Sequence, residues 1–251
     1  MAAPTTFFAV IAGVGPGTGR ATALRFARAY PVALLARSPD SYADLVREIR
    51  AAGGEAVGVS ADTSDPASVA RAFASIRKHW SPDWRLAAAV FNVGAGFAVK
   101  PFLDVTSEEL SASLVGNAGG LFNFAQNALP LLLDSVDHSP HPPTLLVTGA
   151  TASVKGSSRF GTFAAGKFAK RALAQSLARE FGPQGVHVAH VIIDGAIDTP
   201  KLKEIGYKPN NAAPDGLISP DAIADTYWHL HTQHRSAFTQ EVDLRPYVEK
   251  F

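Results

Sequence analysis

Seven short apolar runs divide the chain, and longer stretches with helical spacing of their apolar residues separate them. Several runs are apolar at every position, as in strands of a parallel sheet that helices cover on both faces. The expected strands are Phe7–Ala12, Val32–Ala36, Glu55–Ala61, Ala87–Phe91, Thr144–Thr148, Val186–Ile193 and Glu241–Leu244. The expected helices are Gly17–Ala29, Pro39–Ala52, Pro66–His79, Ser107–Leu133, Thr162–Phe181 and Ser219–Gln233.

This alternation predicts an α/β fold with a doubly wound parallel sheet of about seven strands and helices on both faces. Of the 251 residues, 47% are hydrophobic and 18% are charged, which is enough apolar material for one core. We therefore predict that residues 1–251 form a single domain. Two helix starts carry capping signals, namely Asp65 before Pro66 and the Thr106 to Glu109 capping box.

Charge and composition exclude several classes of function. The net charge of +1 gives no basic surface for nucleic acid, and the lack of cysteine excludes disulfides and thiol catalysis. No Lys or Arg precedes the first apolar run, so we expect no signal peptide. The uncharged stretch Leu110–Leu133 is long enough to span a bilayer, but its internal Asn, Gln and Pro residues favour a helix buried in protein. We expect a cytoplasmic protein that does not bind membranes.

Residues 12–19 read Ala-Gly-Val-Gly-Pro-Gly-Thr-Gly, directly after the first expected strand and at the start of the first helix. Gly13, Gly17 and Gly19 have the spacing G-x-x-x-G-x-G, with Gly15 and Thr18 between them. Glycine permits a tight turn and a close approach of phosphate to backbone N–H groups, and a helix N-terminus favours negative charge. The segment predicts a nucleotide-binding turn, and the alternative is a glycine-rich turn without a ligand.

With this turn, the chain resembles the short-chain dehydrogenase/reductase superfamily, which has a Rossmann-type fold, over essentially its whole length. Ala12 replaces the threonine that opens the usual family motif. The resemblance extends to segments that follow the second, third, fourth and sixth strands, and it implies that they bind an NAD(P) cofactor. The cofactor residues implied in these segments are Arg37, Ser38, Asp62, Thr63, Asn92, Gly94, Ile197 and Thr199.

The end of the second strand indicates which cofactor is preferred. Family members that use NAD place an acidic residue there to hold the ribose 2′-hydroxyl, whereas this chain has Arg37. A guanidinium makes charge-assisted hydrogen bonds to phosphate, and a carboxylate would repel it. We predict that NADP(H) is preferred over NAD(H).

The family resemblance also implies a catalytic Asn, Ser, Tyr and Lys. Asn117 lies in an N-x-x-G-x-F segment and fits the asparagine that holds a water in a proton relay. Lys167 fits the lysine that contacts the cofactor ribose. The tyrosine position, four residues earlier, holds Phe163, which has no ionisable group and cannot act as an acid or base.

The serine position holds Ala150, and a shift of one residue would place Thr151 in the role of the serine. Asp194 stands where the family usually has the proline of a Pro-Gly pair. A carboxylate at the C-terminal end of a central strand lies where such sheets bind ligands, and burial would suit it to acid or base catalysis. The alternative for Asp194 is a turn-forming residue before Gly195. Tyr207 could reach the site, although a surface position is favoured.

These residues leave three functions open. The first is an NADP(H)-dependent oxidoreductase with a non-standard proton donor, acting on a carbonyl, imine or activated alkene of a small hydrophobic molecule. The second is a non-redox isomerase, lyase or cyclase, and the third is an NADP(H)-sensing binding protein. We expect a loop over residues 200–218 to cover the substrate. The family resemblance implies a homodimer or homotetramer, and no metal is expected because His229, His231 and His234 lack accompanying carboxylates.

Overall fold

A computed structural model describes residues 7–81, 83–209 and 212–250. Seven strands form one parallel sheet in the order β3-β2-β1-β4-β5-β6-β7. The strands are β1 Phe7–Ala12, β2 Val32–Ala36, β3 Ala56–Ser60, β4 Arg85–Phe91, β5 Thr144–Thr148, β6 His187–Ile193 and β7 Glu241–Leu244. The doubly wound parallel sheet is therefore confirmed, and most strand bounds agree with the expected ones to within two residues.

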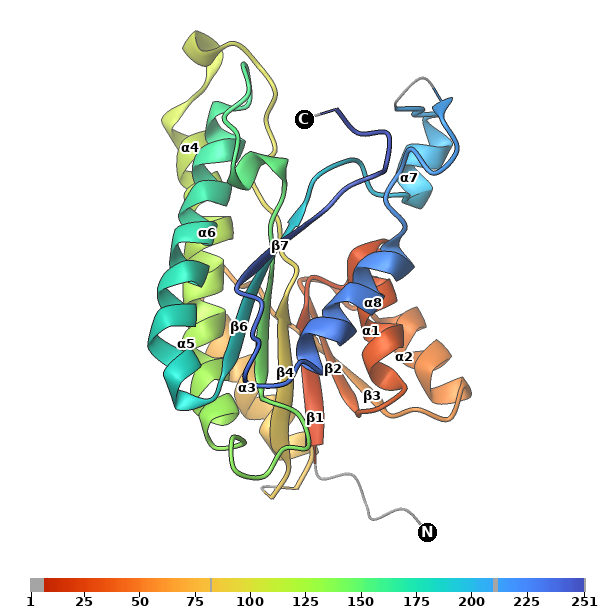
Figure 1. Ribbon diagram of the computed structural model, residues 1–251, viewed down its shortest axis with the longest axis vertical. Helices are drawn as coiled ribbons and strands as arrows, with labels where there is room; N and C mark the ends of the chain where they lie inside the picture. The colour runs from red at the N-terminus through yellow and green to blue at the C-terminus, as the bar shows by residue number, and fades with distance from the viewer. Residues whose placement is uncertain (1–6, 82, 210–211, 251) are drawn as a thin grey trace.

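Helices cover both faces of the sheet (Figure 1). One face carries α1 Thr18–Ala27, α2 Ala43–Ala51 and α8 Pro220–His231; the other carries α3 Pro66–His79, α5 Gly120–Leu133 and α6 Gly161–Phe181. Two shorter helices, α4 Ser107–Leu114 and α7 Pro200–Glu204, lie beyond the C-terminal edge of the strands. Asp65 caps α3, and Thr106 and Glu109 form the expected capping box of α4.

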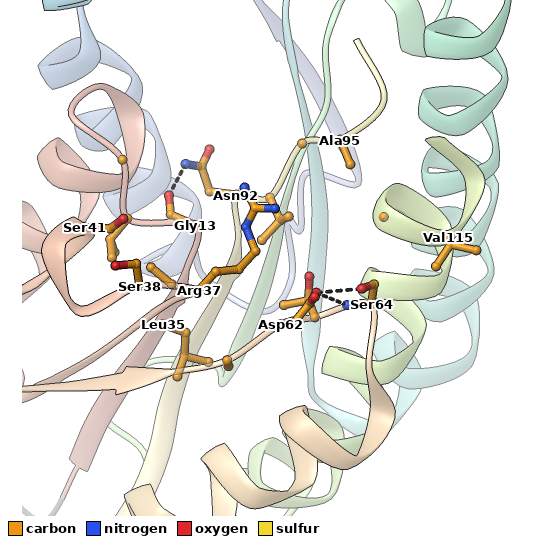
Figure 2. A pocket seen from close by; sticks show the side chains of 18 of the residues that line it. Gly13, Leu35, Arg37, Ser38, Ser41, Asp62, Ser64, Asn92, Ala95 and Val115 are labelled. Atoms are coloured by element: carbon orange, nitrogen blue, oxygen red, sulfur yellow. Dashed lines mark hydrogen bonds between the residues drawn. The ribbon is translucent and has the colours of Figure 1, made fainter. Parts of the chain in front are cut away.

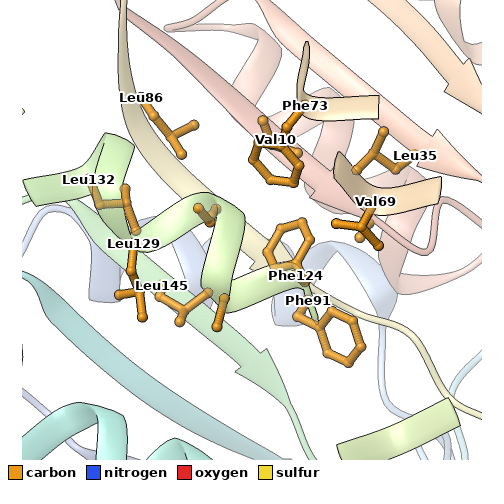
Figure 3. Packing of buried hydrophobic residues seen from close by; sticks show 14 of the residues in the cluster. Val10, Leu35, Val69, Phe73, Leu86, Phe91, Phe124, Leu129, Leu132 and Leu145 are labelled. Carbon is orange, nitrogen blue, oxygen red and sulfur yellow. The ribbon is translucent and has the colours of Figure 1, made fainter. Parts of the chain in front are cut away.

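The core consists of two layers, one on each side of the sheet. In the layer beneath α3 and α5, Phe73 and Phe91 both contact Phe124, with ring centroids 5.5 Å apart in each pair. Figure 3 shows these rings beside Val10 and Leu35 from the inner strands. Burial of such side chains contributes about 1.5–3 kcal/mol each, so this packing holds α3 and α5 against the sheet.

Two expected helices differ in detail from the structure. The Pro39–Ala52 segment begins with a 3-10 turn, Pro39–Ser41, and α2 starts only at Ala43. The Ser107–Leu133 segment is one continuous helical rod, but Val115–Gly119 winds as a π-helix between α4 and α5. Such single π turns inside helices occur frequently at functional sites.

The strand order creates a switch point. From β1 the chain moves outward to β2 and β3, and it then returns to place β4 on the other side of β1. The crossover connections that leave β1 and β4 therefore diverge at the C-terminal edge of the sheet, which opens a crevice where doubly wound folds bind ligands.

Candidate active site

A cleft of about 750 Å³ opens at this switch point. It collects predicted residues from the ends of four strands, namely Gly13, Gly15, Arg37, Ser38, Asp62, Thr63, Asn92 and Gly94. Figure 2 shows Arg37 reaching from the end of β2 into this cleft, with Asp62 and Asn92 on neighbouring segments. The cleft thus contains residues that were selected from four separate sequence motifs.

The glycine-rich turn packs tightly against the end of β4. Gly13 has a φ of +90°, and a β carbon on it would lie 2.8 Å from the backbone of Asn92. The Asn92 side chain donates a hydrogen bond to the Gly13 carbonyl at 2.9 Å. A β carbon on Gly19 would overlap the same carbonyl, whereas one on Gly15 would meet nothing within 4 Å. Gly13 and Gly19 therefore shape the turn, and Gly15 leaves room beside it.

Two charged side chains lie on the wall formed by β2 and β3. Asp62 accepts hydrogen bonds from the Ser64 hydroxyl at 2.6 Å and from the Ser64 backbone at 2.9 Å. These bonds, assisted by the nearby charge of Arg37, hold the pKa of Asp62 below its usual value, although burial opposes them. Ser38 accepts from the Asp40 backbone at 3.3 Å and caps the following turn.

Asn117 occupies the middle of the π turn and is fully buried. Its amide nitrogen donates to the carbonyls of Ala95 and Ser113, both at 2.9 Å. Its side-chain oxygen has no hydrogen-bond partner in the structure, an arrangement that is costly unless a water or ligand group satisfies it. This free acceptor fits the water-holding role expected of Asn117.

Lys167 lies on α6 and is 6% exposed, which is rare for a lysine. Its Nζ is 3.7 Å from the place that a β carbon on Gly94 would take, so it reaches the cleft wall. Burial lowers its pKa from the ordinary value. The Phe163 ring lies 5.5 Å from this Nζ and contacts the exposed ring of Phe97. The tyrosine position is thus part of an aromatic wall.

Thr151 and Asp194 meet at the ends of β5 and β6. The Thr151 hydroxyl donates to the Asp194 carboxylate at 2.6 Å. Asp194 is 7% exposed, and its other oxygen pairs with Arg245 at 3.3 Å. An ion pair and a hydrogen bond offset the cost of burying a charge. Asp194 therefore does more than form a turn, because it anchors the one hydroxyl expected in the role of the serine.

The segment after β6 lies against the glycine-rich turn. A β carbon on Gly17 would come within 2.9 Å of the Thr199 methyl group and 3.9 Å of the Ile197 side chain. Thr18 is buried, and its hydroxyl oxygen has no partner in the structure. These residues adjoin the cleft without lining it, which adds a third side to the expected cofactor site.

The expected loop over residues 200–218 contains α7 and a smaller hollow of about 370 Å³, within the described part of that segment. Tyr207 lines this hollow and is 48% exposed, consistent with the surface position favoured for it. A bridge between Ile197 and Ile218 ties the two ends of the loop together. Its role in covering a substrate remains a prediction.

Two residues of the site were not recognised in the sequence. Arg245 pairs with Asp194 from 51 positions away, and no local pattern connects them. Lys170 is completely buried three residues after Lys167, and a second lysine on an otherwise apolar helix face was a signal that could have revealed it. Among the described residues no group of His, Asp or Glu side chains could hold a metal ion, and no described helix is long and apolar enough to cross a membrane.

Comparison with known proteins identifies the family. The model of the short chain dehydrogenase family matches residues 8–210. The 1-deoxy-11-beta-hydroxypentalenate dehydrogenase of Streptomyces avermitilis is 29% identical over 227 residues, 88% of this chain and 79% of that protein. Sepiapterin reductase of Chlorobaculum tepidum is 29% identical over 247 residues, 94% of this chain and 95% of that protein. A short-chain dehydrogenase structure from Rhodopseudomonas palustris matches with a TM-score of 0.80 at 32% identity, covering 97% of this chain and 100% of that one.

The family match spans most of the chain, and its relatives are named as dehydrogenases and reductases. The protein is accordingly an oxidoreductase that binds a nicotinamide cofactor and acts on a small molecule. It belongs to the short-chain dehydrogenase family.

Proposed function

We propose that the protein is an NADP(H)-dependent oxidoreductase acting on a carbonyl, imine or activated alkene of a small, apolar molecule. The observation that carries this proposal is the cleft wall at the end of β2. The residues lining it there are Leu35, Ala36, Arg37, Ser38 and Ser41, which contribute one cation and no carboxylate. A 2′-phosphate gains a charge-assisted hydrogen bond from a cation in this position, where a carboxylate would repel it.

The residues present fit a dinucleotide. The glycine-rich turn approaches the backbone after β4 as closely as glycine allows, and the space beside Gly15 is open. Hydride donation or acceptance is the chemistry that the cofactor supplies when bound. Gly13, Gly15, Gly17, Thr18 and Gly19 would hold its phosphates at the start of α1. Arg37 and Ser38 would contact the 2′-phosphate, with Asp62 and Thr63 beside the adenine. Asn92, Gly94 and Lys167 would contact the ribose, and Ile197 and Thr199 would contact the carboxamide.

The Thr151 and Asp194 pair would orient the polar end of the substrate. Because the Thr151 hydroxyl donates to Asp194, its oxygen keeps lone pairs that can accept a hydrogen bond from a substrate N–H or O–H. The aromatic rings of Phe97, Phe160 and Phe163 form a wall that reaches Lys167 through Phe163, with the Phe97 ring 6.0 Å from Phe160 and 5.0 Å from Phe163. This wall favours an aromatic or otherwise apolar substrate.

The test is a panel of aromatic and aliphatic carbonyls and imines, with NADPH oxidation followed by absorbance in the wild type and in Thr151→Val. We expect oxidation with some aromatic member of the panel, and a loss of about tenfold or more in kcat/KM for Thr151→Val, since about 1.5 kcal/mol of hydrogen bonding is removed. Thr226→Val makes the same chemical change on α8, where the hydroxyl bonds the Ala222 carbonyl of its own helix and does not line the cleft, and it should leave the rate unchanged. Tight NADPH binding with no oxidation of any member would reject the reductase.

One observation favours a second candidate. Asp194 is a buried carboxylate bonded to a hydroxyl at the edge of the site, as in enzymes that remove a proton from carbon. A non-redox isomerase or lyase would use Asp194 as its base. It would bind NADPH without oxidising it and would lose activity in Asp194→Asn.

We also propose that copies of the chain associate through α4, the π turn, the start of α5 and the neighbouring face of α6. Large apolar side chains are exposed there, namely Leu110, Leu114, Val115, Phe122 and Phe168. An exposed apolar patch of this kind is typical of a protein interface. Light scattering after size exclusion should give a dimer or tetramer, and Phe122→Glu should shift it toward the monomer.

A further inference from the structure

Two lysines of α6 are buried side by side behind the cleft. Lys167 is 6% exposed, and Lys170, one helical turn further on, is not exposed at all. Both extend toward the segment that follows β4. The Lys170 Nζ donates to the Val93 carbonyl at 2.9 Å and lies 5.5 Å from the Phe91 ring, while the Lys167 Nζ faces Gly94 on the cleft wall.

Neither lysine has a carboxylate to neutralise it. Within the described part of the chain, the ion pairs made by lysines are Lys100 with Glu109 and Lys203 with Asp198. Both of those pairs lie on other elements. A buried ammonium without a counter-ion is costly in free energy, so burial favours loss of a proton from the pair.

The elements packed around the pair supply few charges. Among the described residues, the end of β4 contributes the neutral amide of Asn92 and the π turn contributes that of Asn117. The segment after β5 contributes the hydroxyl of Thr151, which donates to the Asp194 carboxylate, and that carboxylate is already paired with Arg245. Another titratable neighbour is His190 on β6, whose pKa is lowered chiefly by burial, an effect that the hydrogen bond to Glu241 opposes. Glu241 on β7 is already engaged by His190 and by an arginine of α6.

Two adjacent ammonium groups in such surroundings repel each other and are both poorly solvated. Burial lowers the pKa of Lys167, and a hydrogen bond with Lys170 opposes that shift. Burial lowers the pKa of Lys170 further, and the neighbouring Lys167 charge adds to the effect. Lys170 therefore loses its proton first, and its neutral amine accepts a hydrogen bond from the Lys167 ammonium while still donating to Val93.

We propose that Lys167 and Lys170 hold one ammonium proton between them and that Lys167 delivers it to the substrate oxygen, in place of the tyrosine that Phe163 replaces. In this step an N–H bond of Lys167 breaks, an O–H bond of the product forms, and the electron pair stays on the nitrogen. Solvent in the cleft then returns a proton to Lys167. Lys170 is a positioning residue, because it acts on Lys167 and does not touch the substrate.

The delivery of the proton to substrate rests on the proposed function, whereas its sharing between the lysines does not. The sharing is tested on cofactor-free protein by NMR titration of lysine side chains labelled with 13C at the ε carbon. We expect two lysine signals that titrate in two separate steps, the first of them at lower pH than the signals of the exposed lysines. Lys170→Met should leave one step, and Lys78→Met should leave both. If the signals of Lys167 and Lys170 titrate over the same pH range as those of the exposed lysines, the shared proton is overturned.

The catalytic half is tested with two variants of similar length. Lys170→Met removes the acceptor that stabilises the Lys167 ammonium, so the fall of kcat at high pH should begin at lower pH. Lys170→Gln keeps an acceptor oxygen and an N–H for Val93, and it should restore the wild-type pH profile. The Kd for NADPH should change by less than about threefold in both variants, since Lys167 is retained. Two titration steps combined with an unchanged kcat profile in Lys170→Met would overturn the delivery of this proton to the substrate.

Discussion

The choice of cofactor should depend on Arg37, and Arg37→Ala tests this most simply. Arg37 lines the cleft at the end of β2. The pKa of Asp62, which follows β3, is lowered mainly by hydrogen bonds from Ser64 and to a smaller extent by the Arg37 charge. A hydrogen bond to a charged group contributes about 1.5–3 kcal/mol. Because Arg37 is exposed to solvent, screening favours the lower end of this range. About 1.5 kcal/mol corresponds to roughly a tenfold change in Kd.

The assay is isothermal calorimetry with NADPH and NADH on the wild type and on Arg37→Ala. We expect NADPH binding to weaken about tenfold and NADH binding to change by less than about twofold, because NADH has no 2′-phosphate. Arg47→Ala is the matched control, since Arg47 pairs with Asp44 on the surface of α2 and does not line the cleft.

Salt gives a second and independent measure of the same interaction. Raising the ionic strength from about 0.05 to 0.5 M should narrow the preference of the wild type for NADPH, and it should have little effect on Arg37→Ala. The reasoning is refuted if Arg37→Ala binds NADPH as well as the wild type does, or if both cofactors weaken equally.

Two other substitutions test the geometry of the site and the core. Gly13→Ala should lower the free energy of unfolding by about 1–3 kcal/mol, because alanine resists a φ of +90° and its β carbon would meet the backbone after β4. In Gly15→Ala the free energy of unfolding, measured by urea titration, should differ from that of the wild type by less than about 0.5 kcal/mol. Equal losses in the two variants would contradict this reasoning. His231 is buried between Tyr30 and Thr144, and burial, with smaller contributions from neighbouring histidines, lowers its pKa to about 3. Below pH 6.5 the unfolded chain binds a proton that the folded chain does not, so stability should fall by about 2–3 kcal/mol between pH 6.5 and 4.5. This slope should flatten in His231→Gln but persist in the exposed variant His229→Gln, and a slope that is unchanged in His231→Gln would refute the assignment.

The sheet was predictable because its strands carry their own signal. Phe7–Ala12 and Thr144–Thr148 have the bounds that their apolar runs indicate, since a strand covered on both faces must be apolar at nearly every position. The π turn at Asn117 was not predictable, because an extra residue in a helical turn leaves the apolar spacing on either side almost unchanged.

Part of the candidate site was predictable from the sequence for a similar reason, and part was not. The cofactor residues Gly13, Arg37 and Asn92 follow strands, and parallel strands bring their ends together, so sequence order placed them in one cleft. The residues that contact the catalytic candidates could not be predicted in this way. Arg245 pairs with Asp194 and Lys170 donates to the Val93 carbonyl, and both contacts join elements that are distant in sequence. Only the packed structure shows them.

The central claim is that this site transfers hydride although the tyrosine position holds Phe163. The direct measurement is a reaction with NADPH carrying deuterium at both C4 positions of the nicotinamide, followed by mass spectrometry of the product from the carbonyl and imine panel. The account predicts a product that has gained one deuterium from the labelled cofactor. A product that forms without the label, or NADPH that binds tightly and is recovered unchanged with every member of the panel, would contradict it and favour the non-redox enzyme based on Asp194.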